Sequence, residues 1–264
     1  MNMDGLIIFG GFSATLLIVI AAIEGGHRLG VKLLRHSSDE KESSASTIAG
    51  SILGLLAFML AFTFGIVTDR YDARKTLVRD EANAIGTAYL RSDFLPEADR
   101  EKAAALFREY VGARLRAAQT RERGALQEAL SATDRIHRQL WGMAVANARK
   151  DMNSDVAALY IDSLNAVIDF HSSRVAVMQA RIPTGIWVVL YALVILGMIG
   201  LGYQTAIAGS RRSWMTPVLA LAFSIVIALI NSLDSPHSGF ITVSQQPLEA
   251  LRDSMAAARR LSAQ

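Results

Sequence analysis

Residues with reactive side chains are few in this sequence, and they do not form the patterns of known catalytic motifs. There is no cysteine, which excludes disulfides, thiolate metal ligands and cysteine nucleophiles. Nothing in the sequence brings two histidines to the spacing of a metal site, so we expect no metal and no cofactor. The GxxxxGK[ST], GxGxxG, HExxH and GxSxG motifs are absent. The sequence therefore predicts no catalytic residue and no enzyme. The five histidines are His27, His36, His137, His171 and His237.

Three apolar residues indicate a different kind of chemistry, the passage of ions. Phe58, Phe62 and Ile66 are four residues apart and therefore line up on one face of a helix. Copies of such a face around a shared axis form an apolar constriction that gates by dewetting. The same side chains are also consistent with packing against neighbouring helices or lipid, and spacing alone favours this simpler interpretation.

Four charged residues follow this face at the mouth of any such pore: Asp69, Arg70, Asp72 and Arg74. Because both signs are present, rings of either charge are consistent with the sequence. The ion is therefore not predicted from these residues.

The elements that position these residues are four apolar blocks without a charged residue. A helix needs about 20 residues to cross a bilayer core about 30 Å thick, and each block is close to that length or longer. Helices on a soluble core keep a polar face, and these blocks have none. The blocks are residues 5–23, 47–68, 184–208 and 215–233. They predict an all-α membrane protein with four transmembrane helices, a polar loop over 24–46 and transmembrane helices three and four within 184–233.

The long segment between the second and third blocks, residues 69–183, is predicted to be a helical extramembrane domain. Its apolar residues recur at helical spacing, and no period-two runs are present. Breaks at Pro96, at Gly124 and at residues 153–155 divide it into helices near 69–93, 97–119, 123–150 and 154–181. Residues 234–264 are predicted to be an ordered tail that ends in an amphipathic helix.

The second block continues into the domain without a helix breaker, which predicts one rigid helix that projects from the bilayer into water. Gly50 and Gly54 form a GxxxG motif, which allows another helix to approach closely. This motif predicts helix packing within the chain or between copies of it.

Lysine and arginine counts give an expected orientation in the bacterial cytoplasmic (inner) membrane. Four basic residues lie in loop 24–46 and two in loop 209–214, whereas the N-terminal tail has none. The positive-inside rule then places both loops in the cytoplasm, and residues 69–183 and both termini outside. A net charge of only +3 gives no reason to expect nucleic acid as a partner.

Short motifs resemble those of a known family. "FMLAF" at residues 58–62, followed by Arg70 and Tyr71, is similar to the second membrane helix of bestrophin anion channels. A fuller resemblance is to the bestrophin-like domain family of bacterial and plant membrane proteins. It is carried by "RDEANAIGTAY" at 79–89, "GSRRS" at 209–213 and "LDSPHSGFITVSQQPL" at 233–248.

The resemblance to bestrophins implies a homo-oligomer, expected as a pentamer, whose second helix lines a pore for an anion or another small ion. Phe58 and Phe62 would take the place of the apolar neck residues of that family. Bestrophins have a third apolar residue four positions before the first phenylalanine, and this sequence has Gly54 at that position. Bestrophins hold the corresponding domain in the cytoplasm, which conflicts with the orientation expected from the basic residues. We keep the latter expectation because it comes directly from these residues.

Two functions of different class are consistent with the sequence. The first is a homo-oligomeric ion channel in the lipid bilayer with its pore lined by the second helix. The second is a non-conducting scaffold or sensor whose helical domain binds a partner. A transporter is less well supported, since the two halves show no inverted repeat and no span contains a charge.

Overall fold

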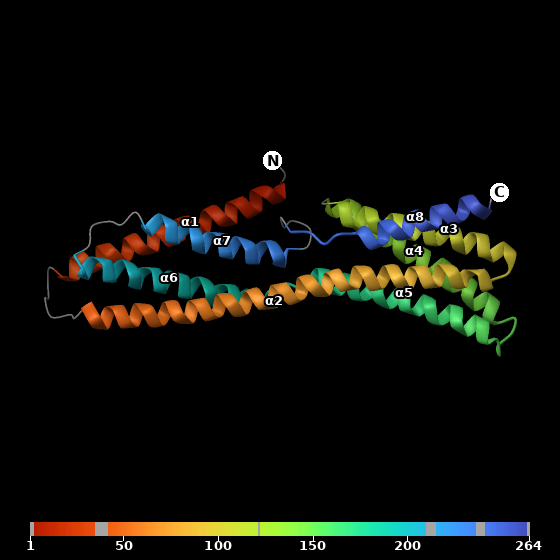
Figure 1. The fold of residues 1–264 in the computed structure, drawn as a ribbon, viewed down its shortest axis with the longest axis horizontal. Helices are drawn as coiled ribbons and strands as arrows, with labels where there is room; N and C mark the ends of the chain where they lie inside the picture. The colour runs from red at the N-terminus through yellow and green to blue at the C-terminus, as the bar shows by residue number, and fades with distance from the viewer. Residues whose placement is uncertain (1–2, 35–41, 121, 210–214, 236–240, 263–264) are drawn as a thin grey trace. The chain divides into compact units, whose positions relative to one another are not determined.

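The computed structural model describes residues 3–34, 42–120, 122–209, 215–235 and 241–262. Every regular element in these residues is helical, which confirms the all-α fold class (Figure 1). The elements are α1 (Met3–Leu34), α2 (Glu42–Arg91), the short 3₁₀ helix η1 (Ser92–Phe94), α3 (Glu97–Gln119), α4 (Arg123–Ala148), α5 (Asp155–Gln179), α6 (Thr184–Ile207), α7 (Met215–Asp234) and α8 (Gln246–Ser262).

Four of the described helices are long and apolar enough to cross a membrane, as the four blocks predicted. They are α1, α6, α7 and the first part of α2. With 50 residues, α2 is about 75 Å long at 1.5 Å per residue. Since a bilayer core is only about 30 Å thick, the charged remainder of α2 must lie in water. The expected rigid strut is therefore a single helix in the structure.

One of the two predicted connections is shorter than expected. We expected a polar loop over 24–46, but α1 continues to Leu34 and α2 already begins at Glu42. Residues 24–34 contain no proline, and Arg28 Nε lies 2.8 Å from Glu24 Oε1 one helical turn earlier, which supports a helix here. The remaining residues, 35–41, lie outside the described part of the chain, as do residues 210–214 of the second predicted loop.

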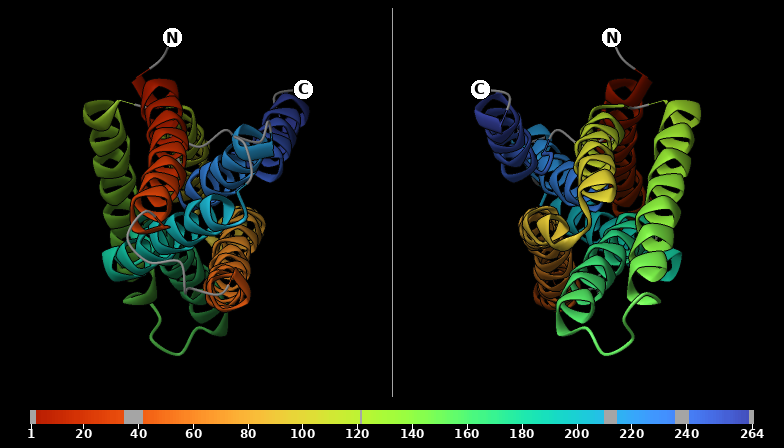
Figure 2. Two further views of the ribbon diagram at one scale, coloured as in Figure 1. Left: turned by 90° about the vertical axis from the view of Figure 1, so that its left-hand side faces the viewer. Right: turned by 90° about the vertical axis from the view of Figure 1, so that its right-hand side faces the viewer.

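The chain folds into two compact units, and each is described separately. The membrane unit comprises Met1–Arg70 and Arg181–Thr242. In it α1 runs beside α6 and α7 (Figures 1 and 2). Glycines make the closest approaches: a Cβ added to Gly26 would lie 2.1 Å from the carbonyl oxygen of Ile199, and one added to Gly202 would lie 2.0 Å from that of Ile23. These glycines let the backbones of α1 and α6 touch.

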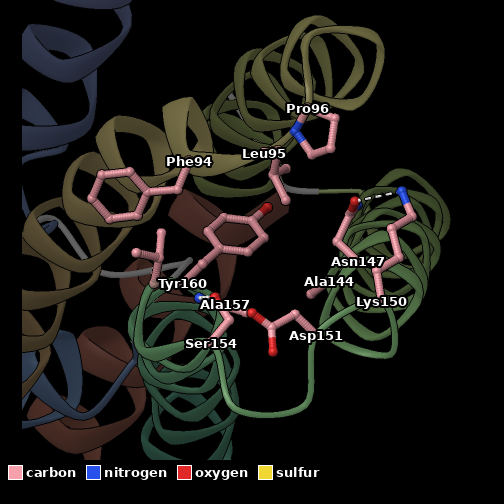
Figure 3. Close-up of a pocket in the computed structure, with 11 residues that line it drawn as sticks. Phe94, Leu95, Pro96, Ala144, Asn147, Lys150, Asp151, Ser154, Ala157 and Tyr160 are labelled. Atoms are coloured by element: carbon pink, nitrogen blue, oxygen red, sulfur yellow. Dashed lines mark hydrogen bonds between the residues drawn. The ribbon is translucent and has the colours of Figure 1, made fainter.

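The helical unit comprises Tyr71–Ala180 and Val243–Gln264. Two of its helices begin directly after residues that favour a helix N-terminus. Pro96 precedes α3 in an extended conformation, and Ser154 caps α5 by accepting a hydrogen bond from the Ala157 backbone N–H at 3.2 Å (Figure 3). Helices α4 and α5 each end within two residues of the predicted positions.

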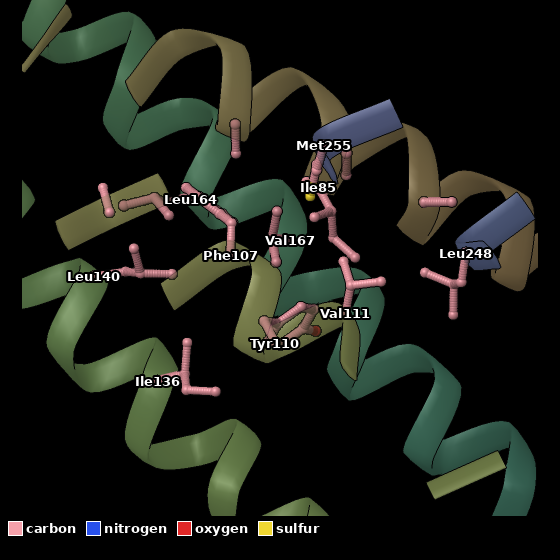
Figure 4. Packing of buried hydrophobic residues seen from close by; sticks show 14 of the residues in the cluster. Ile85, Phe107, Tyr110, Val111, Ile136, Leu140, Leu164, Val167, Leu248 and Met255 are labelled. Atoms are coloured by element: carbon pink, nitrogen blue, oxygen red, sulfur yellow. The ribbon is translucent and has the colours of Figure 1, made fainter. Parts of the chain in front are cut away.

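The core of the helical unit is an apolar cluster drawn from five helices. Figure 4 shows Phe107, Tyr110 and Val111 of α3 pointing toward apolar residues of neighbouring helices. Leu248 and Met255 of α8 are also fully buried in this cluster, so the predicted C-terminal amphipathic helix packs on the helical unit. Such burial stabilises the unit by roughly 1.5–3 kcal/mol for each large apolar side chain.

Candidate functional site

The apolar face predicted on the second helix is exposed in the single chain. Phe58 is 65% exposed and Phe62 57% exposed, although both lie within a membrane-spanning part of α2. Their rings are stacked, with centroids 6.4 Å apart and an interplanar angle of 14°. The opposite face of α2 is covered by its own chain through Leu56, Leu60 and Val67. The two phenylalanines therefore face lipid or another copy of the chain.

Small residues share this face with the phenylalanines. A Cβ added to Gly50, Gly54 or Gly65 would meet no atom of the described chain within 4 Å. Among the described residues, the predicted GxxxG motif thus has no helix packed on it. Instead, α6 approaches α2 at a neighbouring face, where a Cβ on Gly197 would lie 3.1 Å from Leu53 Cδ2.

Ile66 lies at the edge of this face, since it is half-buried. An α-helix has 3.6 residues per turn, so each step of four residues rotates by about 40°. From Phe58 to Ile66 the rotation reaches about 80°, while Gly65, seven residues after Phe58, is only about 20° off. After Phe62, the exposed face of α2 therefore continues through Gly65 and not through Ile66.

The four charged residues predicted at the mouth are separated by sign. Asp69 and Asp72 are exposed. Asp69 lies seven residues after Phe62, and Asp72 seven after Gly65, so both continue the exposed face. Arg70 is half-buried, with Nη1 3.3 Å from Asp234 Oδ1, and Arg74 is only 7% exposed. Both arginines therefore lie away from the helix face that carries the aspartates, and the assignment of all four residues to a pore mouth stays a prediction.

A second group of ionisable residues lies inside the helical unit. Glu81 of α2 is 0% exposed. Its carboxylate accepts a hydrogen bond from Tyr110 Oη at 2.9 Å, lies 2.9 Å from Arg114 Nε and pairs with Arg174. Gln245, which precedes α8, accepts from Arg174 Nη2 at 3.2 Å. Burial and the adjacent Glu81 charge raise the pKa of Tyr110 well above its usual value of 10, so this hydroxyl remains a donor. The cluster ties α2, α3, α5 and the start of α8 together.

Two histidines lie next to this cluster, a proximity that the sequence did not indicate. The rings of His137 and His171 are 5.1 Å apart and nearly perpendicular. Asp134 Oδ1 is 3.8 Å from His171 Nε2. Burial, and secondly the neighbouring His171, lower the pKa of His137 from 6.5 to about 4. In the described ranges no group of three His, Cys, Asp or Glu side chains is placed to hold a metal ion.

A pocket of about 190 Å³ opens at the junction of η1, α4 and α5 (Figure 3). Phe94, Leu95 and Val156 line its apolar part, and Lys150 and Asp151 its polar part. Lys150 Nζ donates to Asn147 Oδ1 at 2.9 Å. Asp151 Oδ1 accepts a hydrogen bond from the Asn153 backbone N–H at 3.1 Å, so both charged groups of the pocket already bind neighbouring residues of the chain.

Sequence analysis did not identify Glu81 or Asp234 as site residues, although both lie within the motifs that carry the family resemblance. Glu81 had a detectable signal, because it falls on the apolar stripe of α2 between Val78 and Ile85. A carboxylate at such a position is buried and must find partners. Asp234 directly follows the charge-free fourth block, and nothing local marks it as buried.

Comparison with known proteins agrees with this architecture. The family model of the Bestrophin-like domain matches residues 14–248. No curated protein matches the chain.

Solved structures with the same fold come from Klebsiella pneumoniae. A bacterial bestrophin homologue from that organism is 17% identical, with a TM-score of 0.62 over 94% of this chain and 95% of that one. A single-residue variant of the homologue is 16% identical, with a TM-score of 0.63 over 96% and 98% of the two chains. At this identity the likeness shows the fold alone. Together with the family match over nearly the whole sequence, it leads to one conclusion: the chain is a multi-pass membrane protein that belongs to the Bestrophin-like family.

Proposed function

We propose that the protein is a homo-oligomeric ion channel, expected as a pentamer, in which the exposed face of α2 from each copy lines a shared pore. The observation that carries this proposal is the pair of exposed, stacked rings of Phe58 and Phe62 on a face that also carries three open glycines, Gly50, Gly54 and Gly65. Glycines in a membrane helix favour close approach of another helix and add no lipid contact. A face of this kind suits a narrow axis with an apolar constriction.

Phe58 and Phe62 are assigned to the constriction, with Ile66 at its edge. Gly50 and Gly54 are assigned to the approach of neighbouring copies at the opposite end of the same face. A single four-span chain has little room for a pore between its own helices, so assembly is part of the proposal.

The conducted ion is proposed to be a cation. The resemblance to bestrophins implies an anion, but Asp69 and Asp72 are the charges on the exposed face. Repeated in every copy, they place a ring of carboxylates at the mouth, and such rings attract cations. Arg70 and Arg74 lie away from this face, one paired and the other buried.

The experiment is ion flux from liposomes that hold the purified full-length chain. Replacing both phenylalanines, Phe58→Ala with Phe62→Ala, should raise the flux at least about tenfold, the equivalent of lowering the barrier by roughly 1.4 kcal/mol. Phe9→Ala is the matched control, because Phe9 is 61% exposed on α1 and should leave the flux unchanged.

Two results would count against a channel. One is background flux in both the wild type and the double variant, which would support a non-conducting scaffold or sensor. The other is a native mass equal to one chain of 28.6 kDa.

A further inference from the structure

One buried carboxylate of the membrane unit joins the end of α7 and the start of α6 to the middle of α2. Asp234, the last residue of α7, is 5% exposed. Its Oδ1 and Oδ2 lie 3.1 and 3.3 Å from the backbone nitrogen of Ile182, just before α6, and Oδ1 is 3.3 Å from Arg70 Nη1 of α2. The Arg181 guanidinium donates to the backbone carbonyl of Asp234.

The partner of this carboxylate is the residue next to the proposed mouth. Arg70 directly follows Asp69, and the side chain of Arg70 is 26% exposed whereas that of Asp234 is 7% exposed. Because consecutive residues of a helix are about 100° apart, the pairing holds the Arg70 guanidinium on the side of α2 that faces α6 and α7. A long arginine side chain without such a partner has the reach to approach the carboxylate of Asp69 and cancel its charge.

We infer that Asp234 preserves the negative charge of Asp69 at the mouth by holding Arg70 away from it. Asp234 is in this sense a positioning residue for ion selection that acts through Arg70 and does not itself touch the ion. The inference rests on the proposed channel function and on the assignment of Asp69 to the mouth.

Asparagine is the informative replacement at position 234. Asp234→Asn keeps an oxygen that accepts from the Ile182 N–H, so the junction of α6 and α7 retains its hydrogen bond. The substitution removes the negative charge, and Arg70 and Arg181 are left without that counter-charge. A change in the properties of Asp234→Asn can therefore be assigned to the lost charge and not to a lost hydrogen bond between α6 and α7.

The experiment measures the reversal potential of the reconstituted full-length chain in a potassium chloride gradient. Asp234→Asn should lower the ratio of cation to anion permeability about two- to fivefold, as expected for one unit charge per copy moved within about 10 Å of the pathway. Adding Arg70→Gln to Asp234→Asn should restore the wild-type ratio. Asp253→Asn, an exposed carboxylate beside Arg252 on α8, is the matched control and should change nothing.

Asp69→Asn tests the proposed function in the same assay and should also lower the ratio. If Asp69→Asn lowers it and Asp234→Asn does not, the role of Asp234 is refuted and the channel stands. The same holds if the double variant fails to restore the ratio, or if Asp234→Asn breaks the assembly in native mass measurements. If the wild type shows no selective current at all, the channel function itself fails.

Discussion

At the scale of single residues, Glu81 is the buried carboxylate that neutralises part of the charge of two buried arginines in the helical unit. It is fully buried, and its charge compensates two guanidinium groups, Arg114 and Arg174, that are themselves 2% and 6% exposed. Burial raises the cost of every unpaired charge in such a cluster. The net positive cluster is thus stable only while the carboxylate is present.

Glu81→Gln should therefore destabilise the chain by about 3–5 kcal/mol, since two buried cations lose their counter-charge. Asp80→Asn is a matched control one residue earlier. Its only described ion pair, with Arg79 at 3.1 Å, is solvent-exposed and contributes less than about 1 kcal/mol. The free energy of unfolding in urea, measured on the full chain in detergent, compares the two, and equal losses would contradict the assigned role of Glu81.

His137 predicts a dependence of stability on pH. Above pH 6.5 it is neutral in the folded and the unfolded chain and contributes no pH dependence. Between pH 6.5 and 4 the unfolded chain binds a proton that the folded chain does not, because the folded pKa is about 4. Stability should thus fall as pH falls through this window, by up to about 3 kcal/mol for this residue.

Thermal unfolding at pH 7.5 and pH 4.5 checks this expectation. His137→Gln removes the titrating group, so this variant should lose less stability than the wild type over the same interval. An identical pH dependence in the two proteins would show that His137 does not titrate as its buried position implies.

At the scale of elements, the contact of α1 with α6 depends on glycines that exclude any side chain. Gly26 and its neighbour Gly25 make a sensitive comparison, since a Cβ on Gly25 meets nothing within 4 Å whereas one on Gly26 meets the Ile199 carbonyl. Gly26→Ala should destabilise the protein by about 1–3 kcal/mol through overpacking.

Gly25→Ala should be neutral or slightly stabilising, because alanine is the better helix former. The midpoint of thermal unfolding of each variant in detergent gives the comparison. Equal midpoints would mean that the two helices can move apart at little cost.

At the scale of the whole molecule, the orientation in the membrane is an open prediction with two opposed expectations. The basic residues near α1 and between α6 and α7 predict an external helical unit, whereas the resemblance to bestrophins implies a cytoplasmic one. Because the chain has no cysteine, single introduced cysteines report the side directly.

From the distribution of basic residues we expect Met152→Cys, at a position 80% exposed in the helical unit, to react with a membrane-impermeant maleimide in intact cells. Arg28→Cys in α1 should react only after lysis. The reverse pattern would overturn the charge-based orientation and support the bestrophin-like one.

By itself the sequence determined the number of spans, the all-helical class and the continuity of α2 across its apolar and charged parts. These follow from local composition, since about 20 uncharged residues suffice for a span and no breaker interrupts α2. The spacing of Phe58 and Phe62 likewise predicted a shared helix face.

Only the tertiary structure decided which charges meet. Arg174 reaches Glu81 across 93 residues, and Asp234 reaches Arg70 across 164. Periodicity indicates which side of a helix is buried, but the partner of a charged group depends on how helices cross and in which register they pack. For the same reason, the sequence showed Arg70 and Asp69 as neighbours of opposite sign, and only the packed helices paired Arg70 with Asp234.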